Sequence, residues 1–458
     1  MPKFMLRGIF FFFLSAFFIF FHSCSLNVPP EEPDTETEIR HNLLTTQMYI
    51  AHWQSSEFGF YQNIWMQQLA GVRSGSVMEK VDRYQMDYAH TNDIWAFYFE
   101  YCLLGLETIL NQANTLNAPA FKGIANTLKA YTMLMMTDSW GDMPFTQAHF
   151  YFGAGLPAYD RQEDILPTLL ELIDLAVAQL EAGNEPGSLI PLAQDDPIFN
   201  GNLDRWIRAA NLTRIRIMLR LANKTGDYSQ VFGTMQSISL LRDNADNMLY
   251  HFDGAGTSGT NPYYYYDREV QHTRMGSFMV QLLKETEDPR LPRYVRRNIQ
   301  NEYLGSAPGQ SLSSASYIGL GIASDTSPLM MLTYAEQKFI EAELYLRAGQ
   351  QANADQAYTQ GVKASLQYMQ VSDPSWEATH AEITGLTMQQ IITAKYTALF
   401  LQPEVWTDFR RTGYPALPPH DDKTIPRKFI YPQNEISGNQ SNVPDPGTIF
   451  DRVWWDNE

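Results

Sequence analysis

The spacing of apolar residues from about residue 41 onward most constrains the fold of this chain. Apolar side chains recur three and four residues apart, which is the period of an α-helix with one buried face, and the alternation typical of β-strands is scarce. This pattern predicts helices over residues 92–114, 118–137, 160–180, 203–223, 329–348, 353–369 and 388–401. The predicted fold class is therefore mostly all-α, with long irregular loops.

One stretch has the residue spacing of a tetratricopeptide repeat. Ala342, Tyr345, Ala354, Tyr358 and Gly361 occupy its small and aromatic positions in order. The small residues let two antiparallel helices approach closely, and the tyrosines fill the space between them. The other predicted helix pairs show this spacing less clearly, so the pattern predicts a helical-repeat-like body.

The predicted loops at 140–160, 183–202, 250–275 and 301–327 are long and rich in Gly, Pro, Ser and Tyr. Long loops on a helical frame commonly carry binding functions. No linker divides the chain after residue 40, so we expect residues 41–458 to form a single α-helical domain.

The N-terminus has the features of an export signal. Lys3 and Arg7 flank the start of the apolar run 8–21, which is too short to cross a bilayer because a spanning helix takes roughly 20 residues. Residues 1–23 are thus expected to be a signal peptide. Cys24 follows directly, as in a bacterial lipobox, and is the expected lipidation site; the alternative is an ordinary cleavable signal with an incidental cysteine. Residues 24–40 contain three prolines and five acids, a composition that predicts an extended tether.

Composition excludes several function classes. The net charge of −18 and pI of about 4.9 argue against nucleic-acid binding, which needs a clustered basic surface. Two cysteines exclude a disulfide-stapled fold, and Cys102 is expected in the core. Neither H-E-x-x-H nor G-x-S-x-G occurs. We therefore predict no catalytic residue, no metal ligand and no cofactor.

Aromatic residues in the loops are the best candidates for a binding surface. Four consecutive tyrosines in a loop cannot all face one core, so one or two should be exposed, where a flat ring stacks on a sugar or packs on a peptide. The alternative is that the rings pack across the helical body, and for Trp95 a core position is the commoner outcome. The predicted ligand-binding residues are Arg73, Tyr84, Trp95, Tyr263, Tyr264, Tyr265 and Tyr266.

Several motifs in sequence order resemble the SusD/RagB family of nutrient-binding outer-membrane lipoproteins of Bacteroidetes. The best matches are W-T-D-F-R-R-T-G-Y-P at 406–415 and Y-P-Q-N-E at 431–435. Residues 137–145, 203–221 and 327–343 are similar to further family motifs, and the acids behind Cys24 resemble the family's surface-export signal. The resemblance covers essentially the whole chain after Cys24.

The resemblance implies a fold built on four tetratricopeptide-like helix pairs. It also implies a cell-surface lipoprotein that serves polysaccharide utilisation by binding a nutrient, typically an oligosaccharide. The partner would be a TonB-dependent SusC-like outer-membrane barrel that the protein covers as a lid, and the only membrane contact would be the N-terminal lipid. The motif residues Arg410, Arg411 and Tyr431 are expected to join chain segments, and no individual ligand-binding residue is carried over.

Three alternatives stay open. The first is a surface-anchored all-helical glycoside hydrolase, which needs two carboxylates about 5–10 Å apart in one cleft. The second is a SusD-like binder of peptides rather than glycans. The third is a purely structural or adhesive lipoprotein.

Overall fold

The structure is a computed structural model that describes residues 35–149, 155–185, 192, 195–421 and 423–457. The predicted signal peptide, the lipidation of Cys24 and most of the predicted tether lie outside these residues. In the described part, no helix combines the length and the apolar character that crossing a membrane requires.

Helices make up most of the chain, and their order runs from α2 to α20. The longer ones are α2 (Thr35–Ser55), α3 (Glu57–Trp65), α6 (Leu104–Thr115), α7 (Pro119–Trp140), α8 (Gln162–Gly183), α9 (Leu203–Thr225), α10 (Ser229–Ser237), α13 (Ser277–Glu285), α15 (Tyr334–Arg347), α16 (Gln351–Tyr368), α18 (Met388–Ala398) and α19 (Glu404–Thr412). Shorter ones are α4 (Val77–Asp82), α5 (Asn92–Phe97), α11 (Gly256–Gly259), α12 (Pro262–Tyr264), α14 (Leu291–Tyr294), α17 (Pro374–His380) and α20 (Gln433–Gly438).

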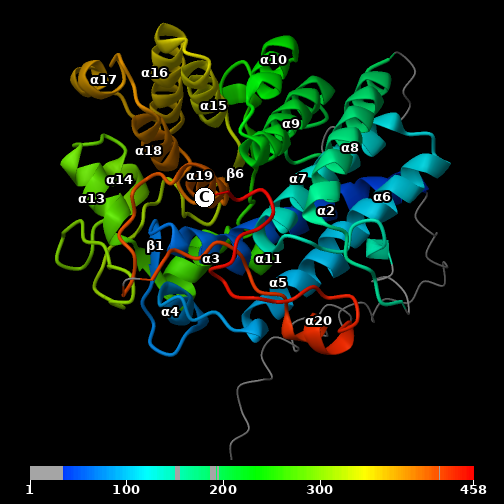
Figure 1. Cartoon of the computed structure of the whole chain (residues 1–458), viewed down its shortest axis with the longest axis horizontal. Helices are drawn as coiled ribbons and strands as arrows, with labels where there is room; N and C mark the ends of the chain where they lie inside the picture. Colours follow the sequence, from blue (N-terminus) through cyan, green and yellow to red (C-terminus); the bar gives the residue numbers. More distant parts are fainter. Residues whose placement is uncertain (1–34, 150–154, 186–191, 193–194, 422, 458) are drawn as a thin grey trace, which may run out of the picture.

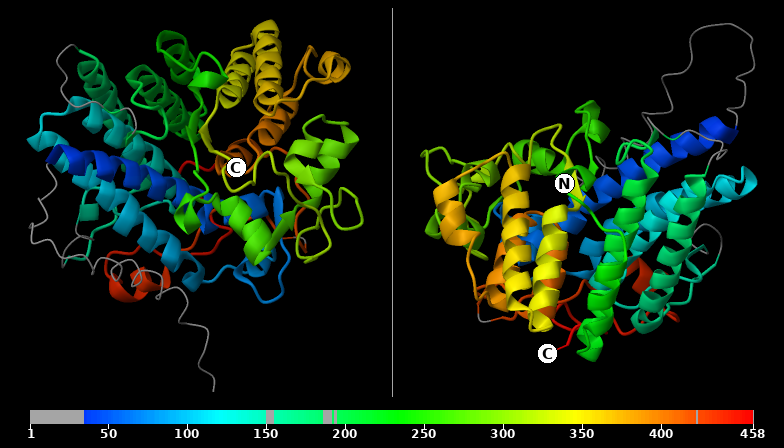
Figure 2. Two further views of the ribbon diagram at one scale, coloured as in Figure 1. Left: turned by 180° about the vertical axis from the view of Figure 1, so that it is seen from behind. Right: turned by 90° about the horizontal axis from the view of Figure 1, so that it is seen from above.

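The long helices pack in neighbouring pairs along one side of the molecule. Helix α7 packs against α6 and α8, α8 against α9, and α15 against α16 and α18. In Figure 1 the ends of α8, α9, α10, α15 and α16 fan along the upper edge, and Figure 2 shows the same row from above and behind. The loop-rich remainder, with α4, α13, α14 and α20, lies below and to the side. The predicted mostly all-α, repeat-like fold is confirmed.

The tetratricopeptide-like spacing corresponds to a real helix pair, α15 and α16. Ala342 and Ala354 are fully buried. A Cβ atom on Gly361 would lie 3.1 Å from the ring of Phe339, so the glycine permits the close approach of the two helices. The ring of Tyr358 meets that of Phe339 edge to face at 5.8 Å.

The helix predicted over 329–348 begins too early. Leu329–Leu332 form strand β6, which pairs antiparallel with β2 (Met248–Tyr250), and α15 starts only after Thr333, whose side chain caps it by accepting from the Glu336 amide at 3.2 Å. A short continuous apolar run fits a buried strand or a buried helix equally well, so periodicity alone could not separate them.

Two further strand pairs tie the loop-rich side together. Strand β1 (Leu69–Gly71) pairs antiparallel with β3 (Thr273–Met275), with Ala70 opposite Arg274. Strand β4 (Val295–Arg296) pairs antiparallel with β5 (Tyr317–Ile318). The predicted loop 250–275 is also partly wound: α11 and α12 lead into a π-helical turn, Tyr265–Val270.

The boundary of the predicted tether needs correction. Helix α2 begins at Thr35, and Ile39 is fully buried in the main core, as is Leu43 one turn further on. Residues 35–40 therefore belong to the folded domain, because the apolar face of α2 starts inside the acidic segment.

Aromatic rings from distant segments fill the centre of the core. The ring of Phe429 lies edge-on to those of Trp65 at 5.2 Å and Trp140 at 5.0 Å, and it stacks on Trp406 at 5.6 Å. These rings come from α3, α7, α19 and the C-terminal segment. Cys102 is fully buried, as predicted.

Candidate ligand-binding site

A surface hollow of about 350 Å³ lies where two of the predicted binding loops meet. Its lining residues follow strand β1 or belong to the π-helical turn, strand β3 and the loop before β5. They are Val72, Arg73, Glu269, Val270, Gln271, Arg274 and Ser313. Segments far apart in sequence thus meet at one hollow: Arg73 and Val270 are 197 positions apart. That a ligand binds here stays a prediction.

The β1–β3 pairing positions this hollow. The Val72 amide extends the pairing by donating to the His272 carbonyl at 3.0 Å, so Arg73 emerges next to the end of the π-helical turn. Gly71 is required here, because a Cβ atom would come within 2.0 Å of the Met78 carbonyl oxygen in α4. Gln271 adopts a left-handed conformation (φ 56°), which turns the chain from the π-helical turn into β3.

Arg73 is exposed and held by its neighbours. Its guanidinium donates to the Val270 carbonyl at 3.1 Å and lies 3.0 Å from Nε2 of His272. Burial is the main cause that lowers the pKa of His272, and the positive charge of Arg73 lowers it further. The neutral ring can therefore accept a hydrogen bond from the Arg73 guanidinium. Arg73 is therefore oriented before any ligand arrives.

The four tyrosines take different environments, because successive side chains point in different directions around a helical turn. Tyr263 is buried and donates its hydroxyl to the Leu401 carbonyl at 2.7 Å, while Tyr264 and Tyr266 are half-buried. Tyr265 has 41% of its surface exposed. It lies four residues before Glu269 in the same π-helical turn, and it is not itself one of the lining residues.

The other predicted aromatic contacts are in the core, which corrects their prediction as ligand-binding residues and, for Trp95, agrees with the core alternative. Trp95 is buried, with its ring edge-on to Trp140 at 5.3 Å and stacked on Tyr159 at 6.2 Å. Tyr84 is also buried, edge-on to His420 at 5.9 Å. With Tyr263, these rings cannot stack on a ligand in this conformation. Ligand contact by Arg73 and Tyr265 stays a prediction.

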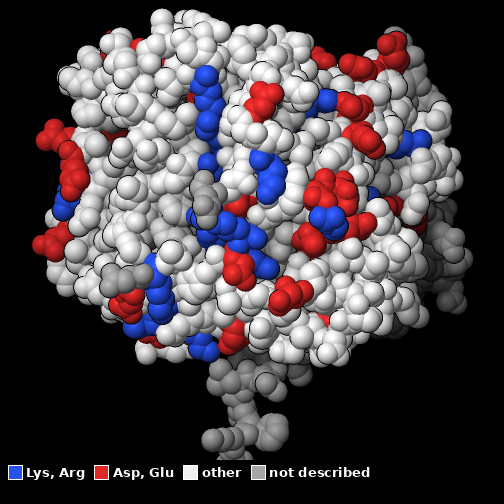
Figure 3. Space-filling view, in the orientation of Figure 1, with Lys and Arg blue, Asp and Glu red and all other residues white. Residues whose placement is uncertain are grey.

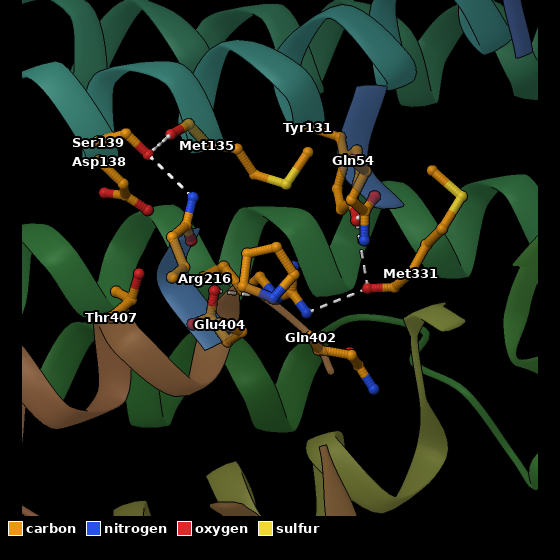
Figure 4. A pocket seen from close by; sticks show the side chains of 12 residues that line it. Gln54, Tyr131, Met135, Asp138, Ser139, Arg216, Met331, Gln402, Glu404 and Thr407 are labelled. Carbon is orange, nitrogen blue, oxygen red and sulfur yellow. Dashed lines mark hydrogen bonds and ion pairs between the residues drawn. The ribbon is translucent and has the colours of Figure 1, made fainter. Parts of the chain in front are cut away.

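A second cavity is small and lined mainly by polar side chains. It has room for about one water molecule, with a volume of about 10 Å³, and lies between α2, α3, α7, α9, α19 and strand β6 (Figure 4). Tyr131 donates to Gln54 at 2.8 Å, and Arg216 to the Met331 carbonyl at 3.2 Å. Glu404 receives two hydrogen bonds from Arg220 at 2.8 and 2.6 Å.

The carboxylates of this cavity are committed to ion pairs. Burial opposes ionisation of Glu404, but Arg220 and Arg216 outweigh it and hold its pKa well below the usual range. Asp138 pairs with the same Arg220 at 2.9 Å. Burial, only partly offset by Arg220, raises the pKa of Asp138. Through these ion pairs the network joins α7, α9 and α19.

A third hollow, of about 490 Å³, lies between α16, α17, α18 and the end of α13. Trp376 and His380 stack in its wall at 4.7 Å, and the Trp376 indole donates to the Thr286 carbonyl at 2.7 Å. The sequence analysis missed this hollow. The spacing of four residues between Trp376 and His380 was the available signal, since it places both rings on one helix face.

The motif residues hold the C-terminal part against the helices. Arg410 lies 3.6 Å from the ring of Trp406 and donates to the carbonyls of Asp138 at 2.6 Å and Arg427 at 2.9 Å. Arg411 forms a buried ion pair with Glu343, and the Tyr431 hydroxyl donates to the Asp142 carbonyl at 2.9 Å. The expectation that these residues join chain segments is confirmed.

Charged groups are sparse on the face in Figure 3, where Lys and Arg gather near the middle, close to the C-terminus. In the C-terminal segment, Arg427 and Arg452 both pair with Asp456. Within the described ranges, no cluster of three or more His, Cys, Asp or Glu side chains could hold a metal ion.

Comparison with known proteins decides the family. A SusD-like family model, described as "Starch-binding associating with outer membrane", matches residues 33–432. The chain belongs to this SusD-like family.

Solved structures share the fold of this SusD-like chain. A chitin-binding SusD homologue from Flavobacterium johnsoniae superposes with a TM-score of 0.77 at 24% identity, covering 92% of this chain and 98% of the other. A SusD homologue from Bacteroides fragilis gives 0.74 at 23% identity, covering 91% and 99%. A SusD/RagB family protein from Bacteroides thetaiotaomicron gives 0.77 at 19%, covering 91% and 98%. No curated protein matches the chain.

The family match starts at residue 33, close to the first residue of α2. It ends at residue 432, so it includes the W-T-D-F-R-R-T-G-Y-P motif and both segments that form the hollow around Arg73. In this SusD-like chain the hollow is thus part of the family domain rather than an addition to it.

Proposed function

We propose that this SusD-like protein binds a glycan at the cell surface and delivers it to a TonB-dependent SusC-like transporter in the outer membrane. The observation that carries the proposal is the hollow around Arg73, in a chain of a family described as starch-binding. The exposed Tyr265 lies in the same π-helical turn as the lining residues Glu269 and Val270. The chitin-binding homologue of the same fold supports a glycan as the ligand.

The chemistry of the hollow suits binding of a sugar. An exposed flat ring such as Tyr265 offers an apolar face for the C–H groups of a pyranose. The side chains of Arg73, Gln271 and Ser313 offer hydrogen-bonding groups for hydroxyls. Glu269 is the one carboxylate among the lining residues, whereas hydrolysis of a glycosidic bond needs two. The proposal is therefore binding without turnover.

The proposed location rests on the N-terminal sequence. The basic and apolar leader ends at Cys24, whose acylation would anchor the protein in the outer membrane and leave the body at the cell surface. A lipid anchor fits a folded domain in whose described part no helix could cross a membrane.

Substitution of Tyr265 tests the binding site. We expect Tyr265→Ala to weaken glycan binding roughly 3- to 10-fold, because the stacking energy of a ring is about 0.5–1.5 kcal/mol. Stability should be unchanged, since the ring is exposed. The measurement is titration calorimetry of the purified protein against a panel of oligosaccharides, beside a thermal melt.

Tyr88→Ala is the matched control, because Tyr88 is exposed to a similar degree (36%) and lies in a different turn, Tyr88–Thr91, which contributes no lining residue to the hollow. Equal glycan affinity of the wild type and Tyr265→Ala would show that the ligand binds elsewhere. Binding of peptides but not glycans would favour the peptide alternative.

A further inference from the structure

Three guanidinium groups surround one ring beside the hollow. The guanidinium carbons of Arg274, Arg268 and Arg296 lie 4.0, 5.0 and 5.1 Å from the centre of the Tyr317 ring. The β1–β3 and β4–β5 strand pairs bring these residues together from four segments. Arg73 lines the same hollow as Arg274.

Positive charge exceeds negative charge in this cluster. Of these four arginines, only Arg268 has a carboxylate within ion-pair distance in the described part of the chain, Asp267 at 3.2 Å. Asp267 and Glu269 are the acids of the same turn, so four guanidinium groups face two carboxylates. The whole chain has the opposite balance, a net charge of −18.

Burial makes this arrangement costly without a counter-charge. Arg274 is only 4% exposed, and its donors go to the neutral Thr273 carbonyl at 2.7 Å and Gln271 Oε1 at 3.3 Å. Its Nε has no hydrogen-bond partner among the described residues. Burying a charge without an ionic partner is unfavourable, and one cation–π contact offsets only part of that cost.

Asp267 is the carboxylate that pairs with an arginine of this cluster. Burial raises the pKa of this carboxyl to about 6, although Arg268 and the Ile318 amide favour its ionised form. Burial, together with the charge of Arg296, lowers the pKa of Arg268. At neutral pH Asp267 is thus largely ionised, and it pairs with Arg268 alone of the four arginines.

We propose that the hollow binds a negatively charged group of the glycan, a carboxylate or a sulfate, with Arg73 and Arg274 as its ligands. This inference rests on the proposed function and narrows its substrate class to acidic glycans. Guanidinium groups bind planar or tetrahedral oxyanions through two parallel hydrogen bonds. Arg268 and Arg296 add positive potential, whereas Glu269 opposes the anion and limits its affinity.

The test compares acidic and neutral oligosaccharides of equal length. We expect oligogalacturonate or a sulfated chondroitin oligosaccharide to bind at least 10-fold more tightly than a neutral chito-oligosaccharide at low salt. The two acidic probes distinguish a carboxylate from a sulfate ligand. The preference should shrink as NaCl is raised from about 20 to 200 mM, because salt screens exposed charges.

Variants of the lining residues test whether a preference for acidic probes arises from the hollow. Arg73→Gln should weaken binding of the acidic probe about 10-fold and leave the neutral probe within 2-fold, and Glu269→Gln should strengthen acidic binding. Both residues are exposed, so the fold should tolerate these changes. Arg297→Gln is the control, because this arginine stacks on Tyr303 at 4.2 Å and does not line the hollow.

The failure of this inference differs from that of the proposed function. In one outcome, neutral glycans bind, the Tyr265→Ala change weakens that binding, and the acidic probes bind no more tightly than the neutral ones. The inference of an acidic ligand is then wrong, and the proposed glycan-binding function stands. If no glycan of either charge binds, the proposed function is wrong and this inference falls with it.

Discussion

Asp82 shows how one buried carboxyl joins three segments near the hollow. It lies at the end of α4 and accepts hydrogen bonds from the amide of Gly309 at 2.6 Å and from that of Gly71. Burial raises its pKa to about 7 in spite of these bonds. The loop before β5, strand β1 and α4 are therefore held together by a group that changes charge near neutral pH.

We predict that Asp82 makes the protein less stable as pH rises. The folded state keeps the proton up to about pH 7 while the unfolded state releases it near pH 4, so the free energy of unfolding falls across that window. Asp82→Asn cannot titrate and still accepts a hydrogen bond. When the pH is raised from 5 to 8, the free energy of unfolding of the wild type should fall by roughly 2–3 kcal/mol more than that of Asp82→Asn.

Urea unfolding of both proteins at the two pH values measures this difference. Other titrating groups, such as Glu57, contribute equally to both and cancel. Parallel pH profiles of the two proteins would contradict the prediction.

For single residues, the sequence identified candidate binding residues by their chemistry better than it predicted whether their side chains are exposed. Arg73 and Tyr265 could be identified as candidates, but Trp95, Tyr84 and Tyr263 were also named as candidate binding residues and are buried. Exposure depends on which distant segment covers a side chain: the partner of Tyr263 is the carbonyl of Leu401, far along the chain. The arginine cluster around Tyr317 was invisible for the same reason.

Among the elements, helices were predictable and short strands were not. Helices α7, α8, α9 and α16 have apolar faces long enough to establish their period, and their predicted ends are correct within a few residues. Strands such as β1 and β3 have three residues each, too few for any period. These strands nevertheless position the hollow, because they align the segment before Arg73 with the one that carries Arg274.

We predict that Gly71→Ala disrupts the contact between β1 and α4. The new Cβ would lie 2.0 Å from the Met78 carbonyl oxygen, so the helix must move and stability should fall by about 1–3 kcal/mol. Glycan affinity should fall too, because Arg73 is two residues away.

Gly233→Ala in α10 is the control for this change. Nothing lies within 4 Å of its Cβ position, and alanine favours a helix over glycine by about 1 kcal/mol, so this variant should be slightly more stable. Thermal melts compare the two. A Gly71→Ala protein that melts like the wild type would show that α4 adjusts without cost.

For the whole molecule, family and fold followed from motifs spread along the sequence, since the order of several short patterns is more specific than any one. The buried contacts of Arg410, Arg411 and Tyr431 explain why those patterns mark the fold: each holds the C-terminal part to a helix. The loops around the hollow lie outside these patterns, so no motif in the sequence marks the site.

The proposed anchor predicts the behaviour of the whole protein in a cell. Cys24→Ala should abolish incorporation of a labelled fatty acid and move the protein from the outer-membrane fraction to the soluble fraction. Cys102→Ala is the control, because this thiol is buried and should leave both readouts unchanged. Firm membrane attachment of the Cys24→Ala protein would contradict lipidation at this position.

The start of α2 at Thr35 limits how far the body can travel from such an anchor. Thr35 lies eleven positions after Cys24. A fully extended chain spans at most about 3.5 Å per residue, so the tether between Cys24 and Thr35 can reach no more than about 40 Å. A transporter within that radius meets the body at a local concentration on the order of millimolar, which makes docking effectively unimolecular. A longer tether would therefore lower the local concentration of the protein at the transporter.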